Sequence, residues 1–553
     1  SKLLGLGGWL PSVYNFYDAN SKKLFQGDGQ VRAVVALPWN ISGFMIPSED
    51  GSLVNFFDQT GRQLFTKTSI TGSTRYAFNY DSVGRIESID EPFGKTTYFN
   101  RDSSGNFKSV IAPNGETTAV ALDANGYVSA FTNPNGEAYS MTYSGSFGLL
   151  ATFTKPGGQT STFTFDSDGN LARDSHSGGY FFDIVKNAAS GSAFNFRKTT
   201  GLGRQTIYAG SSTPTSINRM TTSPGGQSTI FAYSINTTGG NDSQSTQSGG
   251  DITSSQFQND PRFGASFKYL KYHNVQYGSA SYLITNNVTA SLSTPTDPFS
   301  IIAMTATTNK GAKTLSTSYS PTTKKFSSIT GLGRSAKIGI DSYERVTSVK
   351  NGALDSTQLI YTNADLTRIQ QGSRVTDLVY HSTSGLLESV TNPLSQITSF
   401  AYNNAGRMIA KTLPDLRVIN FSYDGNGNIV GITPPGRTIH AFTSNSQELL
   451  GSYAPPAISG VSIVATLYSY NSDKQLTQIT KPNGNSILFT YNTVTGTLQS
   501  MTTPLGSYAV GMNTSNSMLS SVFVPSGPKN YFTYSGTKLT ENRVTTTANA
   551  AIY

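Results

Sequence analysis

The sequence has no cysteine and few of several other residues on which common protein chemistries depend. Without cysteine it forms no disulfide, no thiolate metal site and no cysteine nucleophile, so its stability must come from packing and hydrogen bonding. Charged residues make up only 13% of the chain, and there are two tryptophans and four histidines. No apolar run of about 18 residues occurs, which excludes a membrane-spanning helix.

Tyrosine and phenylalanine are abundant instead, with 29 and 31 copies. Aromatic residues favour β-strands over helices. Because charged residues are scarce, the surface must consist largely of serine, threonine, asparagine and glycine. Such a surface is unusual for a cytosolic enzyme and suits an oxidising exterior. We therefore expect an extracellular or cell-surface protein.

The net charge of +8 raises the question of a nucleic-acid partner. Nucleic-acid-binding proteins gather their basic residues on one face, whereas here these residues are scattered along the chain. One short cluster, FKYLKYH from Phe267 to His273, combines basic and aromatic side chains that could follow a phosphate backbone. One such cluster is weak support, so we predict no nucleic-acid partner.

A repeat of 21 or 22 residues runs through much of the chain. The recurring glycines are Gly84, Gly105, Gly126, Gly148 and Gly169, and the recurring prolines are Pro92, Pro113, Pro134 and Pro156. The same spacing returns in Gly406 and Gly427, and in Pro393, Pro414 and Pro435. Two independent markers with one period indicate a repeat architecture.

Each repeat contains two turns, which we call the Asp turn and the Pro turn. The Asp turn has Asp or Asn three residues before its glycine, at Asp58, Asp81, Asp102, Asp123, Asp166, Asn403 and Asp424. This side chain can accept a hydrogen bond from the backbone N–H two residues later, and the glycine supplies the positive φ that closes the turn. The Pro turn reads EPFG, APNG, NPNG, KPGG or KPNG, where proline fixes φ and glycine ends the reversal.

The segments between the turns have the patterns of strands. Before the Asp turn, apolar residues alternate with polar ones, as in Tyr76, Phe78 and Tyr80, which indicates a strand with one apolar face. After the turn, apolar residues stand two and five positions beyond the glycine, as in Ile86 and Ile89. This odd spacing puts the pair on opposite faces unless a β-bulge intervenes. The sequence leaves both alternatives open.

One hairpin cannot be stable alone, because burying a few side chains does not offset the entropy lost by ordering a whole repeat. Successive hairpins must therefore share faces and edges. We predict an all-β fold in which antiparallel hairpin repeats of about 21 residues form one long meander. A flat meander of this length would expose its edges and an apolar face, so we expect it to spiral into a large, hollow shell or barrel.

We divide the predicted shell into three sections of one continuous wall. Residues 1–185 and 341–553 carry regular repeats. Residues 186–340 are irregular, rich in serine, threonine and glycine, and contain insertions. Within this section, TGLGRQ from Thr200 to Gln205 and TGLGRS from Thr330 to Ser335 keep a repeat-like form.

The recurrent Tyr-Asp-x-x-Gly-Arg pattern resembles the YD repeat, also called the Rhs repeat. The pattern is found in YDSVGR, FDQTGR, YNNAGR and YDGNGN, and residues 6–32 and 50–64 are similar to the first part of bacterial Rhs and teneurin-like shells. The resemblance implies a spiralling β-shell that encloses space. In Rhs proteins and Tc toxin complexes such a shell holds a C-terminal toxic polypeptide, and in teneurins a related shell belongs to a cell-surface adhesion receptor.

Bacterial members of this family usually end in a core segment with an Asp-Pro-x-Gly-rich signature and an aspartate-dependent self-cleavage site. No such segment occurs before Tyr553. Two explanations stay open: the chain is truncated, or this member lacks cargo and self-cleavage.

We assign no catalytic, cofactor-binding or metal-binding residue, and we expect that the protein is not an enzyme. The histidines His176, His273, His381 and His440 lie far apart and outside any His-Glu-x-x-His pattern. The stretches DSDG and DGNGN, at Asp166 and Asp424, look like fragments of calcium loops but lack the EF-hand glutamate and occupy the ordinary turn position. GLGR lacks the third glycine of a dinucleotide site, and no Gly-x-Ser-x-Gly elbow occurs.

Two functions remain. The first is an extracellular structural protein that acts in cell-surface adhesion or in recognition of a protein or glycan partner, with displayed loops such as residues 236–260. The alternative is the encapsulating shell of an Rhs-type or Tc-type toxin, whose polypeptide cargo is absent from this chain.

Overall fold

The computed structural model describes residues 15–18, 23–26, 31–33, 35–36 and 43–546, except 146–147, 188, 190, 192, 214, 236–241, 461–463 and 525–526. Much of the stretch 6–32, which resembles the start of known shells, lies outside these residues. The described chain is all-β, as predicted, with a single 3-10 turn, η2 (Pro92–Gly94), and no α-helix. None of the described segments is a helix that could cross a membrane.

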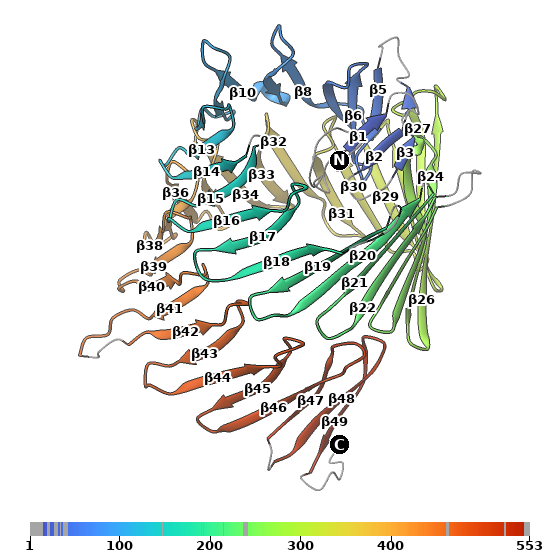
Figure 1. Ribbon diagram of the computed structural model, residues 1–553. Helices are drawn as coiled ribbons and strands as arrows, with labels where there is room; N and C mark the ends of the chain where they lie inside the picture. The colour runs from blue at the N-terminus through green and yellow to red at the C-terminus, as the bar shows by residue number, and fades with distance from the viewer. Residues whose placement is uncertain are drawn as a thin grey trace.

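A small sheet contains β1 (Asn15–Asp18), β2 (Lys23–Gln26) and β3 (Val31–Ala33). All later strands form one continuous antiparallel sheet, each paired with the next along the chain (Figure 1). Its first part contains β4 (Val35–Ala36), β5 (Gly43–Pro47), β6 (Leu53–Asp58), β7 (Gln63–Thr68), β8 (Thr74–Tyr80), β9 (Ile86–Asp90), β10 (Thr96–Arg101), β11 (Phe107–Ile111), β12 (Thr117–Leu122), β13 (Val128–Thr132), β14 (Ala138–Ser144), β15 (Leu149–Thr154), β16 (Thr160–Phe165) and β17 (Leu171–His176).

The sheet continues through β18 (Phe181–Lys186), β19 (Phe194–Thr200), β20 (Gln205–Thr213), β21 (Ser216–Thr222), β22 (Ser228–Ser234), β23 (Asp242–Ser248), β24 (Asp251–Asp260), β25 (Gly264–Tyr277), β26 (Ala280–Leu292), β27 (Ile301–Lys310), β28 (Lys313–Ser320), β29 (Lys325–Thr330) and β30 (Ser335–Ile340).

Its last part contains β31 (Val346–Asn351), β32 (Thr357–Thr362), β33 (Asp365–Gln371), β34 (Arg374–Tyr380), β35 (Leu387–Thr391), β36 (Ile397–Tyr402), β37 (Met408–Thr412), β38 (Val418–Tyr423), β39 (Ile429–Thr433), β40 (His440–Ser444), β41 (Leu450–Ala454), β42 (Thr466–Tyr470), β43 (Leu476–Thr480), β44 (Ser486–Tyr491), β45 (Leu498–Thr503), β46 (Gly506–Met512), β47 (Leu519–Phe523), β48 (Lys529–Ser535) and β49 (Lys538–Thr545).

The Asp turn has the predicted chemistry. Between β8 and β9, the Asp81 carboxylate accepts hydrogen bonds from the backbone N–H groups of Val83 at 3.1 Å and Arg85 at 2.8 Å. Gly84 has a φ of 85°, which a residue with a Cβ atom rarely adopts. The Arg85 side chain adds a second role, because Nε donates to Asp81 at 2.8 Å and Nη1 donates to the Gly105 carbonyl oxygen of the next Asp turn at 2.8 Å. Neighbouring turns are thereby joined.

A β-bulge resolves the odd apolar spacing after each Asp turn. Tyr80 pairs with Ile86 and Phe78 pairs with Ile89, with a register shift between them. The extra residue, Glu87, takes up the odd count, so both isoleucines share a face with the two aromatic rings. The same shift occurs where β10 meets β11, β12 meets β13 and β38 meets β39.

The tyrosine of the YD pattern forms a hydrogen bond that the sequence patterns did not reveal. Tyr402 donates from its hydroxyl to the Leu387 carbonyl oxygen at 2.9 Å, and Leu387 is the residue at the bulge of the preceding repeat. Equivalent bonds of 2.7 to 3.1 Å are made by Tyr80, Tyr143, Tyr361, Tyr380, Tyr423 and Tyr491. Each tyrosine thus ties its own hairpin to the one before it.

The sheet spirals, as the resemblance implied, and its windings are stacked (Figure 1). We call β5 to β28 the first winding and β29 to β49 the second. Pro turns of the first winding lie on Asp turns of the second. The Asn114 side chain donates to the Ser384 carbonyl oxygen at 2.7 Å across 270 residues, and the Gly157 N–H donates to Asn426 at 2.7 Å across 269.

The irregular section from 186 to 340 contains the longest strands, β25 with 14 residues and β26 with 13. Our prediction that residues 236–260 form a displayed loop is wrong where the structure describes them, because Asp242–Ser248 and Asp251–Asp260 are β23 and β24, paired with each other in the wall. Residues 236–241 lie outside the described part. The segment is rich in Ser, Thr and Gln because a wall one sheet thick can expose polar side chains on a strand.

Few side chains are fully buried. The tightest cluster contains Met45, Val54, Phe56 and Phe263, where the start of the wall packs on the longer strands, with Phe299 against it. The accessible surface is 30559 Å², whereas a compact monomer of 59.1 kDa exposes about 19,000 Å². This excess is expected of a thin wall around a hollow and not of a solid domain.

The tyrosine bonds predict a measurable loss of stability when the hydroxyls are removed. A triple variant with Tyr143→Phe, Tyr402→Phe and Tyr491→Phe keeps the rings and loses three bonds of about 1 kcal/mol each, and the sites are far enough apart to add. We expect the free energy of unfolding to fall by about 3 kcal/mol, which urea unfolding would show as a lower midpoint concentration. Tyr98→Phe, at a half-exposed ring, serves as the control, and a triple variant with the wild-type midpoint would contradict the assignment.

Candidate functional site

The two faces of the wall differ in chemistry. In β14 the partly buried Tyr139, Met141 and Tyr143 alternate with exposed Ser140 and Thr142. The rings continue from strand to strand, since Tyr139 stacks on Phe153 of β15 with centroids 5.8 Å apart. Along β14, one face is therefore largely aromatic and the other small and polar.

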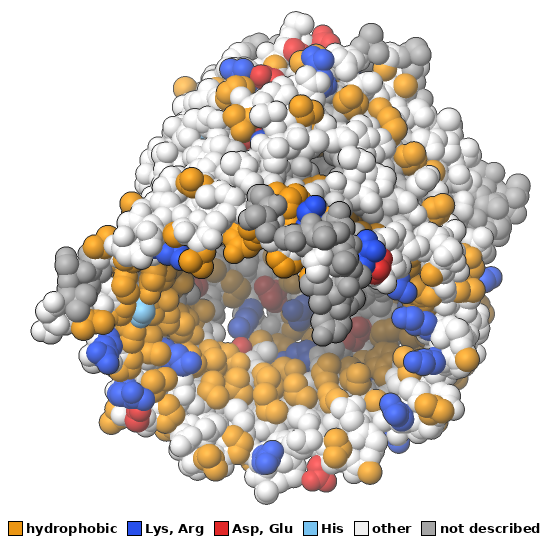
Figure 2. All heavy atoms as spheres, turned by 90° about the horizontal axis from the view of Figure 1, so that it is seen from below, with side chains coloured by type: hydrophobic (Ala, Val, Ile, Leu, Met, Phe, Trp, Pro, Cys, Tyr) orange, Lys and Arg blue, Asp and Glu red, His pale blue; other side chains and the backbone are white. Residues whose placement is uncertain are grey.

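The hollow is open to view from below in Figure 2. Hydrophobic side chains gather along its inner rim, and both basic and acidic side chains lie on the wall behind them (Figure 2). We take this hollow as the candidate site.

An apolar cavity of about 500 Å³ lies on β18, β19 and β20. It is lined by Phe182, Ile184, Phe194, Phe196, Lys198 and Tyr208. Phe196 pairs directly with Tyr208, and Ile184 pairs with Lys198, so these side chains belong to one face. The Lys198 ammonium lies 4.1 Å from the centre of the Phe182 ring. The cavity can receive apolar side chains with one positive charge at its side.

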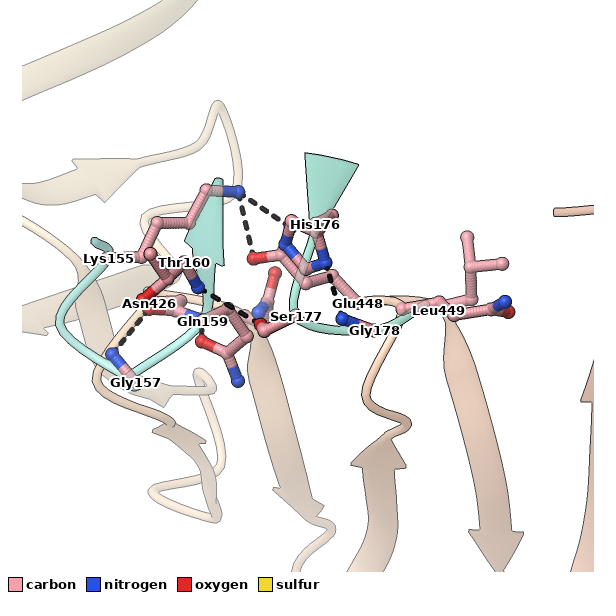
Figure 3. A network of polar contacts seen from close by, with 12 residues as sticks. Lys155, Gly157, Gln159, Thr160, His176, Ser177, Gly178, Asn426, Glu448 and Leu449 are labelled. Carbon is pink, nitrogen blue, oxygen red and sulfur yellow. Dashed lines mark hydrogen bonds and ion pairs between the residues drawn. The ribbon is translucent and has the colours of Figure 1, made fainter. Parts of the chain in front are cut away.

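The seam between the windings contains a compact polar network (Figure 3). Lys155 of the first winding donates to both carboxylate oxygens of Glu448 in the second, at 2.8 and 2.9 Å. His176 Nε2 lies 3.5 Å from Glu448, and His176 Nδ1 accepts a hydrogen bond from the Gly178 N–H at 3.0 Å. The histidine is buried, and burial lowers its pKa below the ordinary value, although Glu448 opposes this effect.

A second ion pair joins Glu137, beside a Pro turn, to Arg407 in an Asp turn 270 residues later. The two guanidinium nitrogens approach the two carboxylate oxygens at 2.6 and 2.5 Å. Hydrogen bonding to Arg407, with further bonds from Asn133 and Asn135, lowers the pKa of Glu137 from 4.5 to about 2. A bidentate pair of this kind fixes both position and orientation of the two turns.

A third pair lies deeper in the seam. Arg204 Nη1 donates to Asp473 at 2.9 Å, and both side chains are only 8% exposed. The Thr200 hydroxyl donates to the same carboxylate at 2.9 Å. The windings are thus held by charged and polar contacts between turns.

The residues singled out in the sequence serve the wall. Asp424 accepts from the N–H groups of Asn426 and Asn428 at 2.9 Å each, and Asp166 makes the equivalent bonds, so both stretches are Asp turns. In the basic cluster, Phe267 packs against the buried core and Lys268 lies 2.5 Å from the buried Asp242 carboxylate.

The four histidines do not converge. Their polar neighbours differ, with His176 at Glu448, His273 at Ser255, His381 at Thr383 and His440 at Tyr453. Over the described ranges, no three His, Asp or Glu side chains form a group that could hold a metal ion.

Comparisons with known proteins agree with the fold. A family model described as Teneurin YD-shell matches residues 42–553. Among solved structures, TcdB2-TccC3 without its hypervariable C-terminal region is similar over 90% of this chain and 36% of that chain, with 10% identity and a TM-score of 0.49. The Photorhabdus luminescens Tc holotoxin pore is similar over 91% and 32%, with 11% identity and a TM-score of 0.41. This chain therefore spans about a third of those chains. No curated protein matches the sequence.

The Glu137 ion pair predicts an acid-sensitive seam. Because the folded pKa of about 2 lies below the ordinary 4.5, the contribution of Glu137 to stability is full above pH 4.5 and is lost as pH falls towards 2. We expect Glu137→Gln to lower the free energy of unfolding by about 1.5–3 kcal/mol at pH 7. Between pH 4.5 and 2 the variant should lose less stability than the wild type, and urea unfolding at several pH values measures both effects. Asp415→Asn, in an exposed pair with Arg417, should change little. Equal effects of the two substitutions would refute a special role for the seam pair.

His176 predicts a second, milder pH dependence. Its folded pKa lies below 6.5, so its contribution is full above pH 6.5 and is lost as pH falls through the lowered value. Protonation at Nδ1 would also break the bond from Gly178. We expect the wild type to lose more stability than His176→Gln between about pH 7 and 5, measured as thermal midpoints. His381→Gln, at an exposed histidine, is the control, and parallel curves for wild type and His176→Gln would exclude this role.

Proposed function

This chain belongs to the teneurin YD-shell family, and from that membership we propose that its wall encloses a polypeptide, as in the encapsulating shell of an Rhs-type or Tc-type toxin. The observation that carries the proposal is the hollow, whose inner rim gathers hydrophobic side chains (Figure 2). We assign the aromatic face of the wall to this hollow. We also propose that the protein acts outside the cell and that the chain itself has no enzymatic activity.

The aromatic face of the wall is incompletely covered. Tyr139, Met141 and Phe153 are each only partly buried, so apolar surface remains in contact with water inside the wall. An unfolded polypeptide also exposes apolar side chains to water. Contact between these side chains and the aromatic face removes both apolar surfaces from water, which is favourable. The cavity at Phe182 and Phe196 is large enough to receive such a side chain.

The seam supports enclosure in a second way. Contacts such as Glu137 with Arg407, and Lys155 with Glu448, join the two windings along their length. They act between turns and leave the strand faces free. Such contacts close the wall between the two windings, and the aromatic face takes no part in them.

Cell-surface adhesion and glycan recognition have less support. That hypothesis relied on a displayed loop at residues 236–260, and residues 242–248 and 251–260 are strands of the wall. Where the outer face carries small polar side chains, as at Ser140 and Thr142 of β14, it offers no large aromatic anchor of the kind found at protein interfaces.

The test is protection of a fused segment. An unstructured reporter of about 100 residues, a length that a protease cleaves readily when exposed, is fused after Tyr553 and the protein is treated with trypsin. We expect cleavage of the reporter about tenfold slower than in the free reporter, because only rare opening exposes an enclosed segment. The readout is the half-life of the reporter on gels.

Two variants sharpen this test. Phe196→Asp with Tyr208→Asp places charges in the apolar cavity and should shorten the half-life of the reporter. Val185→Asp, at a position exposed on the opposite face of β18, is the matched control and should not. A reporter that is cleaved as fast as the free segment in the wild-type shell would overturn the proposal.

A further inference from the structure

The second winding has a row of turns at the edge that carries its Pro turns, and no described segment covers this row. We call this row the lower rim, and it runs from the turn at residues 330–334 to the turn at 503–507. Its last turns, between β43 and β44 and between β45 and β46, lie towards the lower edge of Figure 1. In the first winding the same class of turn is covered, because it lies on the Asp turns of the second. The lower rim is therefore the continuation of an interface that the molecule already uses.

The seam shows how an apolar side chain at a Pro turn is received. Phe93, in the Pro turn after β9, lies with its ring centre 4.8 Å from that of Tyr343 and 4.8 Å from the Arg345 guanidinium carbon. Tyr343 and Arg345 belong to the Asp turn between β30 and β31. An aromatic ring and a guanidinium group of an Asp turn thus form the seat for an apolar side chain.

The lower rim carries leucines at the same position without such a seat. Leu394 and Leu505 follow the proline of their turns, as Phe93 does, and they are 77% and 94% exposed, whereas Phe93 is 41% exposed. The two TGLGR turns show the same contrast. Leu202, in the seam, is 42% exposed, whereas Leu332, on the lower rim, is 86% exposed.

Leu416 of the lower rim is both exposed and held in a strained backbone conformation. It has a φ of 67° and is 82% exposed, and it stands where Gly94 stands in the Pro turn of EPFG. A branched side chain at positive φ is unfavourable, and such strain is commonly kept where a residue has a contact to make. Exposed leucines therefore recur along one rim, on the neighbouring turns of Leu394 and Leu416 and again at Leu505, and such recurring apolar exposure is typical of an interaction surface.

A matching edge exists on the opposite side of the molecule. The Asp turns of the first winding, which we call the upper rim, include those at residues 58–62, 81–85, 102–106 and 123–127. There the Arg62 guanidinium lies 5.6 Å from the centre of the Tyr80 ring. The Arg62 side chain is 49% exposed, and Val83 is 70% exposed. Arg62 stands in its turn where Arg345 stands, and Val83 stands in the next turn where Tyr343 stands. The upper rim therefore offers an exposed guanidinium group and an exposed apolar side chain to a docking leucine.

We propose that the lower rim of one copy of this chain docks on the upper rim of a second copy, with Leu394, Leu416 and Leu505 seated against its Asp turns. The contact is heterologous, because two different surfaces meet, so copies add head to tail and do not stop at a dimer. The inference stands independently of whether the hollow holds a polypeptide.

Association in solution tests the proposal. The whole chain is examined by analytical ultracentrifugation from about 1 to 100 µM, a range that reveals contacts with micromolar dissociation constants. We expect the mean mass to rise with concentration beyond that of a dimer. The lower-rim variant Leu394→Lys, Leu416→Lys, Leu505→Lys should associate at least about tenfold more weakly. The control Val379→Lys, Leu488→Lys, at exposed strand positions away from the turns, should match the wild type.

Complementation distinguishes head-to-tail docking from any other contact. An upper-rim variant, Val83→Lys, Ser104→Lys, Asn125→Lys, should also fail to associate alone. Mixed with the lower-rim variant, it still has an intact lower rim to offer to an intact upper rim, so the mixture should form a heterodimer and nothing larger. A wild-type chain that stays monomeric over the whole range, or blocked variants that fail to pair with each other, would overturn the proposal.

Discussion

A β-bulge interrupts the local ladder of hydrogen bonds, and at several bulges of this wall the tyrosine of the following repeat supplies a new one. The Tyr402 hydroxyl donates to the carbonyl oxygen of Leu387 at the bulge before it, and Tyr423 does the same to Met408. A buried backbone carbonyl without a partner is costly. Where the tyrosine is present, the second hairpin therefore stabilises the bulge of the first, and the two repeats are coupled. The rest of the architecture depends on this joint.

The bulge also bends the strand that carries it, and a bend repeated at every hairpin makes the sheet curve in one direction. Continued curvature with a constant offset gives a spiral, in which one edge of each winding comes to lie on the other edge of the next. Since each hairpin has an Asp turn at one end and a Pro turn at the other, the seam always joins unlike turns. Glu137 beside a Pro turn and Arg407 in an Asp turn are one such pair.

The turns and strands could be predicted because their causes lie within a few residues. Asp81 and Gly84 lie in the same turn and shape it directly, and the alternation of Tyr76, Phe78 and Tyr80 with smaller residues indicates a strand. The bulge was one of two alternatives, since spacing alone does not show which residue is left unpaired. The tyrosine bond had a signal in the sequence. Phenylalanine packs as well as tyrosine, so a tyrosine that recurs at the last strand position before the Asp turn indicates an acceptor for its hydroxyl.

The seam and the strands of the middle section could not be predicted in this way. The partners of the seam are about 270 residues apart, and a single sequence contains no periodic signal that links one chosen glutamate to one chosen arginine. For the hollow itself, the resemblance to YD repeats was informative because the enclosed space follows from the winding and not from any one motif. The polar stretch at residues 242–260 was misread as a loop because polarity was taken as a sign of exposure to solvent on an irregular segment. In a single-layer wall, polarity is also what a strand with solvent beside it requires.

A wall of one layer has little core, and this explains its composition. Outside two small clusters, the described side chains are mostly partly buried, so hydrophobic burial cannot hold the hollow open by itself. Stability is spread instead over ladder hydrogen bonds, Asp turns, tyrosine bonds and seam pairs, each of modest strength. Aromatic residues suit such a wall better than aliphatic ones, because a ring covers its neighbours on adjacent strands from a single layer and, in tyrosine, adds a hydrogen bond at its far end. The same single layer leaves hydrophobic side chains exposed along the inner rim, and the proposed enclosure of a polypeptide relies on this property.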